Sequence, residues 1–364
     1  MRDGLGIDGW LFFAVAALLA IGITMVLSTS YLFSQERFSD GTIFFRKQLT
    51  AAGAGVIALC ICALMPPAGH RRLTYPLLMF TLLVLALVVI PGVGLSRGGA
   101  RRWLSLGGYL FQPAELAKFS LVLYLAHSLA KKGEKMRTFS FGVLPHLIVG
   151  GLFLGLILLE PDLGTALILG LILFLMLFVG GVNFYHLLLI GLMALPVVAL
   201  AVVGAEYRLR RLLVFLDPWR DPSSSGFQII QSYIAFGSGQ VWGRGLGESR
   251  QKLFYLPEAH TDFIFSVIGE ELGFLGAIVV LALFGLLVLR GFQLTAKMEE
   301  PFNQYLAFGL TSLLGLQAFI HMGVVMGLMP TKGLVLPFIS YGGSAMVMNL
   351  VEAGMLLSLS RWRL

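Results

Sequence analysis

The sequence predicts an all-α polytopic membrane protein that forms one domain over residues 1–364, and three observations carry that prediction. First, 57% of the 364 residues are hydrophobic and only 12% are charged, against roughly 25% charged residues in soluble domains. Second, apolar runs recur along the whole chain, each of about 20 residues and long enough to cross a bilayer core of about 30 Å as a helix. Third, no stretch between these runs has room for a soluble domain. These observations exclude a water-soluble fold.

The apolar runs predict ten transmembrane helices. The first run exceeds the roughly 7–15 residues of a signal-peptide core and shows no convincing small-residue cleavage site, so we expect a retained helix. Pro161 divides a continuous apolar stretch into the fifth and sixth helices, because proline interrupts a helix. The predicted spans are roughly 10–33, 45–65, 75–91, 114–130, 143–159, 163–181, 184–204, 263–289, 302–327 and 337–360.

Glycine makes up 44 of the 364 residues, above the usual share of about 7%, as expected where helices pack closely in lipid. The pairs Gly151 and Gly155, or Gly323 and Gly327, are the expected packing sites.

The charges of the short loops predict the orientation. An even number of spans places both termini on one side, where the short loops carry eleven Lys and Arg residues against eight on the other side. Because cytoplasmic loops carry the excess of Lys and Arg, we expect cytoplasmic termini. The long loop then adds seven cations to the outer side. An anionic ligand on that side would account for this surplus.

The long loop, about residues 205–262, is the only extended polar segment, and loops of this size are usually functional or disordered. Its composition argues against disorder, because "GFQIIQSYIAFGSGQVWGRGLG" (226–247) mixes apolar and aromatic side chains with glycine turns. We therefore expect short helices folded back onto the outer membrane surface.

Several familiar kinds of site are missing from the sequence. Cys60 and Cys62 point in different directions on a helix, so they support neither a disulfide nor a metal site. The six histidines lack metal-ligand spacing, and the chain has no P-loop, dinucleotide fingerprint or nucleophile elbow. Its cations border membrane spans without a stacking platform, which argues against nucleic acid as a partner. No metal and no required cofactor are expected.

Ionisable groups at or inside a membrane span cost roughly 2.5–3.5 kcal/mol each on insertion scales, so they are candidates for function. The stretch "GGARRWLSLGGYLFQPAELAKF" (98–119) brings Arg101 and Arg102 to the third loop, and Pro113 fits the first turn of the next helix. Glu115 and Lys118 lie three residues apart on one face of that helix and can pair. A pair that locks two helices explains them as well as a binding site does.

Two further segments lie between predicted spans. "LEPDLGT" (159–165) places Glu160 and Asp162 at a tight turn, which an ordinary surface turn would also explain. "LMPTKGLVLPFISYGGS" (328–344) contains Lys332 and a helix break that starts at Ser340. Non-helical backbone at membrane depth is tolerated only where it lines a cavity or is buried in protein. The second segment therefore predicts a site.

The stretch "YLPEAHTDFIFSVIGEELG" (255–273) places Glu258, His260 and Asp262 at the mouth of the eighth predicted helix. Thr261 can cap this helix, and Asp262 in its first turn would be favoured by the helix dipole, which is a purely structural explanation. The density of ionisable groups beside an apolar run favours a functional one.

Glu270 and Glu271 follow in the same stretch, about 12–13 Å deeper at 1.5 Å per residue of helix. At least one of them is expected to pair with another helix or to reach water. Stability is the expected role, ahead of catalysis.

The four motifs together resemble the SEDS family (shape, elongation, division and sporulation), and the resemblance covers the whole ten-helix chain. "LPEAHTDF" and "PTKG" are more similar to its division branch (FtsW-like) than to its elongation branch (RodA-like), which tends to carry Arg where Ala259 stands and lacks Thr at position 331. The resemblance implies a peptidoglycan glycosyltransferase that polymerises lipid II, a disaccharide-pentapeptide on undecaprenyl pyrophosphate. It also implies work at the outer face of the bacterial inner membrane, at the division septum.

The resemblance assigns roles to residues. The catalytic aspartate of the family falls on Asp262, its cationic pocket positions fall on Arg102 and Lys118, and Glu115 is the partner of the lysine. A base must take the proton from the attacking sugar hydroxyl, which Asp262 can do. Cations can stabilise the departing diphosphate in place of a general acid. Direct displacement would invert the anomeric carbon. Further candidates for substrate binding are Arg101, Lys332, Glu258, His260 and Ser340.

The resemblance also implies partners, namely a class B penicillin-binding protein acting as septal transpeptidase, and a division regulatory subcomplex. A divalent cation at the diphosphate is left open. Other hypotheses are a flippase or transporter for lipid II, since intramembrane carboxylates and broken helices also mark transport paths, an elongation-branch polymerase, and a scaffold that recruits division proteins.

Overall fold

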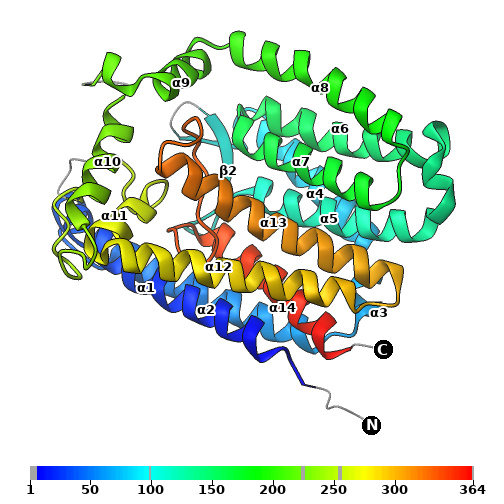
Figure 1. Ribbon diagram of the computed structural model, residues 1–364, viewed down its shortest axis with the longest axis horizontal. Coiled ribbons are helices and arrows are strands. Elements are labelled where there is room, and N and C mark those ends of the chain that lie inside the picture. The colour runs from blue at the N-terminus through cyan, green and yellow to red at the C-terminus, as the bar shows by residue number, and fades with distance from the viewer. Residues whose placement is uncertain (1–5, 98–99, 223–225, 253–255, 363–364) are drawn as a thin grey trace.

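The computed structural model describes residues 6–97, 100–222, 226–252 and 256–362, and these form a nearly all-helical bundle (Figure 1). Seven of its helical stretches are long and apolar enough to cross a membrane. They are α1 (Gly9–Phe38), α2 (Ile43–Leu64), α6 (Leu144–Leu159) with the π turn before it (Phe139–Val143), α8 (Phe184–Val203), α12 (Gly273–Ala296), α13 (Pro301–Val325) and α14 (Gly343–Arg361). The predicted class, a polytopic membrane protein, is confirmed.

Three other helices lie within the same bundle. α4 (Thr74–Val89) and α7 (Leu163–Val179) are apolar but shorter, and α5 (Pro113–Lys132) carries charges at both ends. The short helix α3 (Pro67–Arg72) and a 3-10 turn (Gly133–Arg137) connect bundle helices at one end. Pro113 occupies the first turn of α5, as predicted, because its missing N–H is not needed there.

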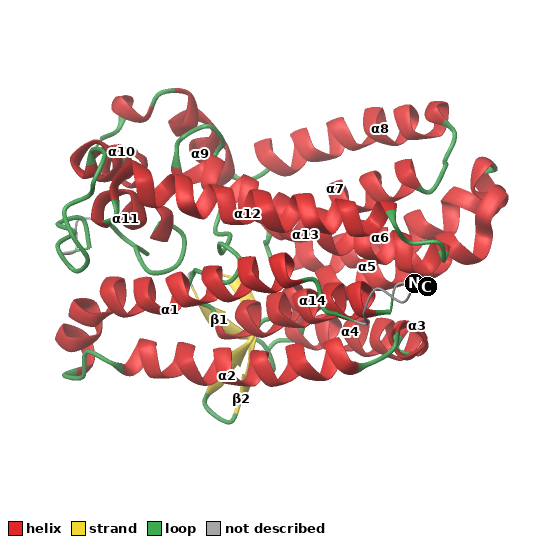
Figure 2. Ribbon diagram, turned by 60° about the horizontal axis from the view of Figure 1, so that its bottom comes forward, coloured by secondary structure: helices red, strands yellow, loops and turns green. Residues whose placement is uncertain are grey.

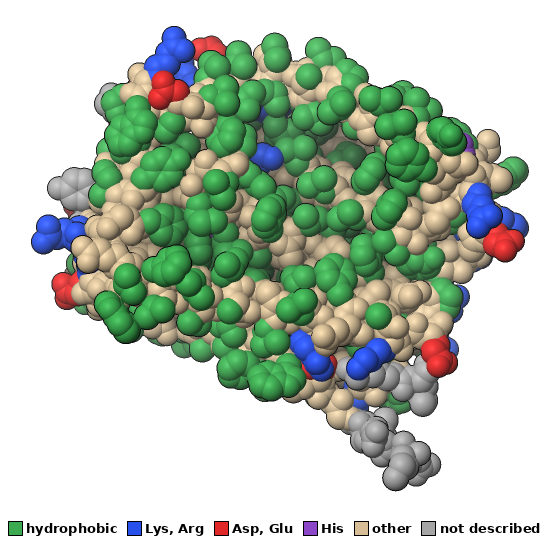
Figure 3. Space-filling view, in the orientation of Figure 1, with side chains coloured by type: hydrophobic (Ala, Val, Ile, Leu, Met, Phe, Trp, Pro, Cys, Tyr) green, Lys and Arg blue, Asp and Glu red, His purple; other side chains and the backbone are tan. Residues whose placement is uncertain are grey.

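The surface of the bundle is divided into an apolar middle and two charged ends. Figure 3 shows hydrophobic side chains over the central part of one face, with Lys, Arg, Asp and Glu gathered towards the two ends. α8 is the most exposed span, with 6% of its apolar window buried, whereas 83% of the window of α14 is buried. Such an exposed apolar helix suits contact with lipid tails rather than with water.

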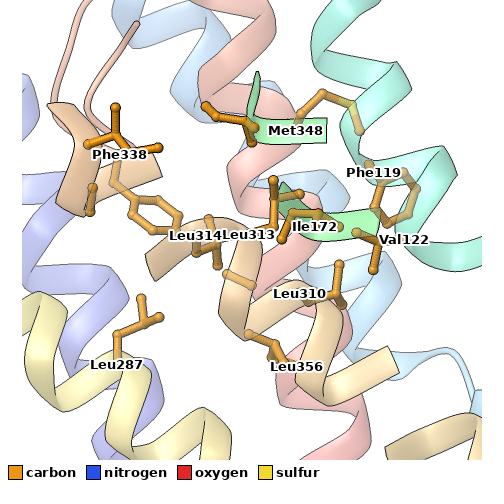
Figure 4. Close-up of a cluster of buried hydrophobic side chains, with 14 of the residues drawn as sticks. Phe119, Val122, Ile172, Leu287, Leu310, Leu313, Leu314, Phe338, Met348 and Leu356 are labelled. Carbon is orange, nitrogen blue, oxygen red and sulfur yellow. The ribbon is translucent and has the colours of Figure 1, made fainter. Parts of the chain in front are cut away.

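The core is built by α5, α7, α13 and α14. Figure 4 shows its centre, where Phe119 of α5, Ile172 of α7, Leu310 of α13 and Met348 of α14 converge, and all four are buried. Between helices already surrounded by lipid, packing depends on close van der Waals contact more than on removal from water.

Close contact requires glycine at particular positions. A Cβ on Gly354 of α14 would lie 2.5 Å from the backbone oxygen of Leu59 in α2, so these helices touch through their backbones. Gly327 is also a packing site, because a Cβ there would overlap the hydroxyl of Tyr233. The expectation for Gly151 and Gly155 is wrong, since nothing lies within 4 Å of a Cβ at either position.

The start of α1 and the end of α14 meet at one end of the bundle (Figures 1 and 2). The backbone N–H of Asp8 donates to Ser360 Oγ at 3.0 Å, and Arg290 Nη2 of α12 donates to Asp8 Oδ2 at 2.6 Å. Both ends of the chain therefore lie on one side, as an even number of spans predicts.

The third loop departs from the all-α prediction. It forms a small antiparallel sheet of β1 (Leu95–Arg97), β2 (Ala100–Leu106) and β3 (Tyr109–Phe111). Gly107 and Gly108, with φ of 56° and 86°, make the two-residue turn between β2 and β3, a conformation that favours glycine. Figure 2 shows these strands beside the helical bundle. The strands are too short for their alternation to stand out in the sequence.

The predicted eighth helix, 263–289, is in fact two helices. α11 (Ile264–Glu271) ends at Leu272, and α12 starts at Gly273, whose φ is 68°. A Cβ on Gly273 would lie 2.3 Å from the backbone nitrogen of Gly243, so the loop packs directly against this break. The apolar run concealed the break, because both halves are hydrophobic.

The long loop contains helices, as its composition predicts. They are the amphipathic α9 (Glu206–Leu216), a 3-10 turn (Pro218–Arg220) and α10 (Phe227–Gly239). Figure 1 shows α9, α10 and α11 at the end of the molecule opposite to the chain termini. The predicted site residues of the 255–273 stretch are brought to this end.

Candidate active site

Asp262 lies in the turn before α11 and not in its first helical turn. The helix begins at Ile264, and its N-cap is Phe263, which makes no side-chain cap. Thr261 Oγ1 instead donates to Glu258 Oε2 at 2.9 Å, and the backbone N–H of Thr261 donates to the Glu258 carbonyl at 3.1 Å. The capping explanation for Thr261 and Asp262 is therefore wrong.

The segment before α14 holds this turn from the other side. Ser340 Oγ donates to the carbonyl of Thr261 at 2.7 Å and accepts from the backbone N–H of Leu336 at 2.8 Å. The N–H of Tyr341 donates to the carbonyl of His260 at 2.9 Å. Ser340 is buried, so its side chain fixes the backbone next to Asp262. Its predicted contact with substrate stays a prediction.

Gly333, the residue after Lys332, lies close to Asp262. A Cβ on Gly333 would lie 3.3 Å from Asp262 Oδ2, so the backbone of this glycine faces the carboxylate. Lys332 is half-buried, and burial lowers the pKa of its ammonium group. The 328–344 segment thus lies against the carboxylate at Gly333, and its role in a site stays a prediction.

His260 is packed into an aromatic group. Its ring centroid lies 5.5 Å from that of Phe33, 5.1 Å from that of Phe44 and 5.7 Å from that of Tyr341. Burial lowers the pKa of its imidazole, against the opposite effect of Glu258. These contacts tie α1 and α2 to the turn, and they account for a histidine in this motif without a ligand.

The carboxylate of Asp262 has an environment suited to accepting a proton near neutral pH. Burial raises its pKa to about 7, with a further increase from Glu258 and a smaller one from Asp162, while Arg211 and Arg102 act in the opposite direction. An efficient general base has a pKa near the working pH. Perturbed carboxylates of this kind are frequent in active sites.

Arg102 joins the hairpin to the turn between α6 and α7. Its Nε donates to the carbonyl of Glu160 at 3.0 Å, and its Nη2 donates to the carbonyl of Pro161. Asp162 accepts from the backbone N–H of Thr165 at 3.1 Å and so caps α7. The "EPDLGT" motif is therefore a structured turn held beside the candidate site, and not an ordinary surface turn.

Glu160 is fully buried in this turn, and neither of its carboxylate oxygens has a hydrogen-bond partner among the residues that the structure describes. Burial raises its pKa to about 8, with Asp162 adding to the increase and Arg102 opposing it. Glu160 thus carries a proton at pH 7.

Lys118 and Glu115 form the predicted pair, with Nζ and Oε1 2.9 Å apart. Lys118 also donates to Gln317 Oε1 of α13 at 2.6 Å and is 1% exposed. Glu352 of α14 lies within electrostatic reach of both charges. The hydrogen bond to Gln317 joins α5 to α13, which favours the structural explanation of the pair. Contact of Lys118 with substrate stays a prediction.

The remaining predicted residues, Arg101 and Glu258, are exposed. Arg101 lies on β2 at the register of Ser96, whereas Arg102 is the arginine within electrostatic reach of Asp262. The structure therefore separates two neighbouring arginines that the sequence treats alike.

A cavity of about 750 Å³ lies near Asp262, since Arg211, which acts electrostatically on this carboxylate, is among the residues that line it. It is lined by Pro257, which precedes Asp262 by five residues, by Thr331, and by residues of α9, its N-cap and α10: Ala205, Glu206, Tyr207, Arg210, Arg211, Phe227 and Gln228. Figure 3 shows the molecular surface hollowed below α8 and α9, with Lys or Arg atoms inside the hollow.

The prediction from the sequence treated the arginines of α9 only as outer cations. It did not place Arg210 and Arg211 at this cavity. Arg208, Arg210 and Arg211 lie within one amphipathic helix of 11 residues. A basic cluster of that kind on an interfacial helix was the signal available in the sequence.

Comparisons with known proteins identify the family of the chain. The family model FTSW_RODA_SPOVE, described as cell cycle protein, matches residues 9–363. A probable peptidoglycan glycosyltransferase FtsW of Geobacter sulfurreducens is 47% identical, covering 94% of this chain and 92% of that protein. Stage V sporulation protein E of Bacillus subtilis is 41% identical, covering 95% and 94%.

Solved structures share the fold. A chain from work described as "Structural coordination of polymerization and crosslinking by a peptidoglycan synthase complex" has a TM-score of 0.79 and 33% identity, covering 98% of each chain. The crystal structure of Thermus thermophilus rod shape determining protein RodA has a TM-score of 0.73 and 32% identity, with the same coverage. The chain therefore belongs to the FtsW/RodA/SpoVE family of cell cycle proteins.

Proposed function

We propose that the protein polymerises lipid II into glycan strands at the outer face of the bacterial inner membrane during septal cell-wall synthesis, with Asp262 as general base. Curated relatives that are 43–47% identical over nearly the whole chain are named as probable peptidoglycan glycosyltransferases FtsW. The chain is a peptidoglycan glycosyltransferase of this family. The lipid substrate, the membrane face and the base are the parts proposed here.

The observation that carries the proposal is the pairing of Asp262 with the cavity. A carboxyl group whose pKa burial raises to about 7 lies beside a space of about 750 Å³, and two arginines line that space. The base and the anion site that glycosyl transfer from a diphosphate requires are thus neighbours.

In the proposed reaction, the carboxylate of Asp262 takes the proton from the attacking sugar hydroxyl. The hydroxyl oxygen bonds to the anomeric carbon while the bond from that carbon to the diphosphate oxygen breaks. The electron pair of that bond leaves with the diphosphate, whose negative charge Arg210, Arg211, Arg102 and Lys332 would stabilise. One carboxylate is then sufficient, and the displacement inverts the anomeric carbon.

The proposed topology has ten spans, with the long loop outside and both termini in the cytoplasm. Support comes from the seven long apolar helices together with α4, α5 and α7 beside them. The contact of Asp8 with Ser360 supports termini on one side of the membrane. The cavity and α9 lie at the opposite end, which the proposal makes the outer one.

The proposed partner is a class B penicillin-binding protein that cross-links the nascent strands, with a division regulatory subcomplex beside it. Support comes from the solved complex described as coordinating polymerization and crosslinking, one chain of which is 33% identical to this protein.

The test is incubation of detergent-purified protein with lipid II, followed by separation of glycan strands on a gel. We expect polymer from the wild type and none from Asp262→Asn, which should still bind lipid II. Transport needs two compartments, whereas polymerisation does not, so binding without polymer in the wild type would favour a flippase. Polymer made by Asp262→Asn would remove this residue from the mechanism.

A further inference from the structure

A second group of buried charges lies at the other end of α11, eight and nine residues after Asp262. Glu270 is 0% exposed and Glu271 is 1% exposed. Glu271 accepts from Lys252 Nζ at 2.8 Å and from Ser28 Oγ of α1 at 2.7 Å. Lys252 is also buried and donates to Ser28 Oγ at 3.0 Å. The three side chains thus form a closed group that joins the loop, α11 and α1.

Glu270 holds the same loop through its backbone. It accepts from the N–H of Arg250 at 3.1 Å and of Gln251 at 3.3 Å, and from the hydroxyl of Ser249. Ser238 Oγ at the end of α10 donates to it at 3.2 Å. Together the two glutamates fix residues 249–252 against the end of α11.

These contacts hold together the two ends of a chain segment that contains the candidate base. The segment starts after residue 252, includes the turn with Asp262, and ends along α11 at residue 270. α11 has eight residues, or about 12 Å at 1.5 Å per residue. A short helix held at one end transmits a shift at that end to the turn at its other end.

An ion pair is not the most stabilising way to join two buried segments. Burying two charges costs free energy that their attraction only partly offsets, and apolar residues of similar volume often give equal or better stability. What a buried charged pair adds is one defined register between the segments that carry it. A fixed alignment of these segments would keep the distance from Asp262 to the cavity constant.

We propose that the Lys252–Glu271 pair, held by Ser28, is a positioning device that sets the place of Asp262 relative to the cavity. The proposal rests on the proposed role of Asp262 as base. Lys252, Glu271 and Ser28 are positioning residues, because they act on substrate only through the turn at the far end of α11.

The test compares Glu271→Gln, the milder Ser28→Ala, and the exchanged pair Lys252→Glu with Glu271→Lys, all in the full chain. We expect Glu271→Gln to lower kcat about 10- to 100-fold with the KM for lipid II changed less than about threefold, and Ser28→Ala to lower kcat by a smaller factor. The exchanged pair should have a kcat well above that of Glu271→Gln and close to that of the wild type.

The pH dependence of kcat is the readout that a merely structural role would not change. The charged groups facing Asp262 are Glu258, Asp162, Arg211 and Arg102, and none is altered by these variants. A loosened turn lets water reach the carboxylate, so the pH midpoint should move below that of the wild type in Glu271→Gln and return in the exchanged pair.

The matched control is the pair of Arg290 and Asp8 at the other end of the bundle, 2.6 Å apart, in which Asp8 is buried and Arg290 is half-buried. Arg290→Gln should lower the melting temperature and leave kcat and the pH midpoint unchanged. The proposal fails if Ser28→Ala and Glu271→Gln lower only the melting temperature. If Glu271→Gln does not fold, the proposal fails when Ser28→Ala and the exchanged pair both keep the wild-type kcat and pH midpoint. An active Asp262→Asn would instead reject the proposed base, so the two failures are distinguishable.

Discussion

Asp262 illustrates how much at the residue scale depends on surroundings rather than on residue type. The chain has 19 Asp and Glu residues, and this one lies in a turn held from two sides, next to Gly333 and the cavity. Burial brings its pKa to about 7. A carboxylate that is partly protonated at neutral pH makes activity sensitive to small changes of pH.

The first prediction at this scale concerns pH. Because only the ionised carboxylate accepts a proton, and its folded pKa is about 7, kcat/KM should rise about tenfold per pH unit below that value and level off above it. The measurement is the initial rate of polymerisation between pH 5 and 9 at low lipid II concentration. A flat profile over this range would contradict the assignment.

The second prediction concerns Arg211, which lines the cavity and lowers the pKa of Asp262. Arg211→Ala should raise the KM for lipid II about tenfold, through the loss of one cation from the diphosphate site, and should shift the pH midpoint upward. Steady-state kinetics over the same pH range measure both effects.

Arg208→Ala is the control for Arg211, because Arg208 is on the same helix but donates to the carbonyl of Ala201 and does not line the cavity. It should behave like the wild type. Equal effects of the two substitutions would point to the general charge of α9 and away from a specific site.

At the scale of elements, the fold combines a rigid bundle with a loop anchored at a few points. α5 and α13 are joined by the hydrogen bond between Lys118 and Gln317, and the turn that contains Asp262 is joined to the segment before α14 by Ser340. The buried group thus keeps in place the helices against which the site is assembled.

The third prediction belongs to these elements. Lys118→Met should destabilise the protein by about 3–5 kcal/mol, because removing one partner leaves an uncompensated buried carboxylate. The double variant with Glu115→Gln should recover part of the loss. Melting curves of the purified proteins measure this, with polymerisation assayed below the melting temperature. Lys118→Met that melts like the wild type yet makes no polymer would return the lysine to the substrate site.

In the whole molecule, an apolar middle separates two charged ends, and the candidate site lies at one of these ends. Two carboxyl groups at that end, the buried Glu160 with a pKa of about 8 and the half-buried Asp262 with a pKa of about 7, couple protonation to folding. Both values exceed the ordinary values of 4.5 and 3.8.

The fourth prediction follows from that coupling. A folded pKa above the unfolded value means that the folded state binds the proton more tightly, so the free energy of unfolding falls as pH rises from about 4.5 to about 8. Each such group contributes up to about 1.4 kcal/mol per pH unit in its window. The melting temperature should therefore be lower at pH 8 than at pH 5, and Glu160→Gln should reduce the difference. If the melting temperatures of the wild type and of Glu160→Gln were both independent of pH, Glu160 would not be a buried carboxyl group that is protonated in the folded state.

The sequence by itself determined the membrane class, the order and most bounds of the helices, and the motif that contains Asp262. Apolar runs of the right length leave few alternatives in lipid, because every backbone polar group must be paired within the segment. It also predicted the pair of Glu115 and Lys118, since a spacing of three residues on a helix suffices for contact.

Only the tertiary structure decided which charges meet. The break at Gly273 depends on the backbone of Gly243 packing against it, and the strands of the third loop depend on pairing across Gly107 and Gly108. Arg211 reaches the site from α9, about 50 residues earlier in the chain than Asp262, whereas Lys118 is enclosed by α13. Electrostatic interaction depends on distance in space and on burial, and a single sequence specifies neither for residues far apart along the chain.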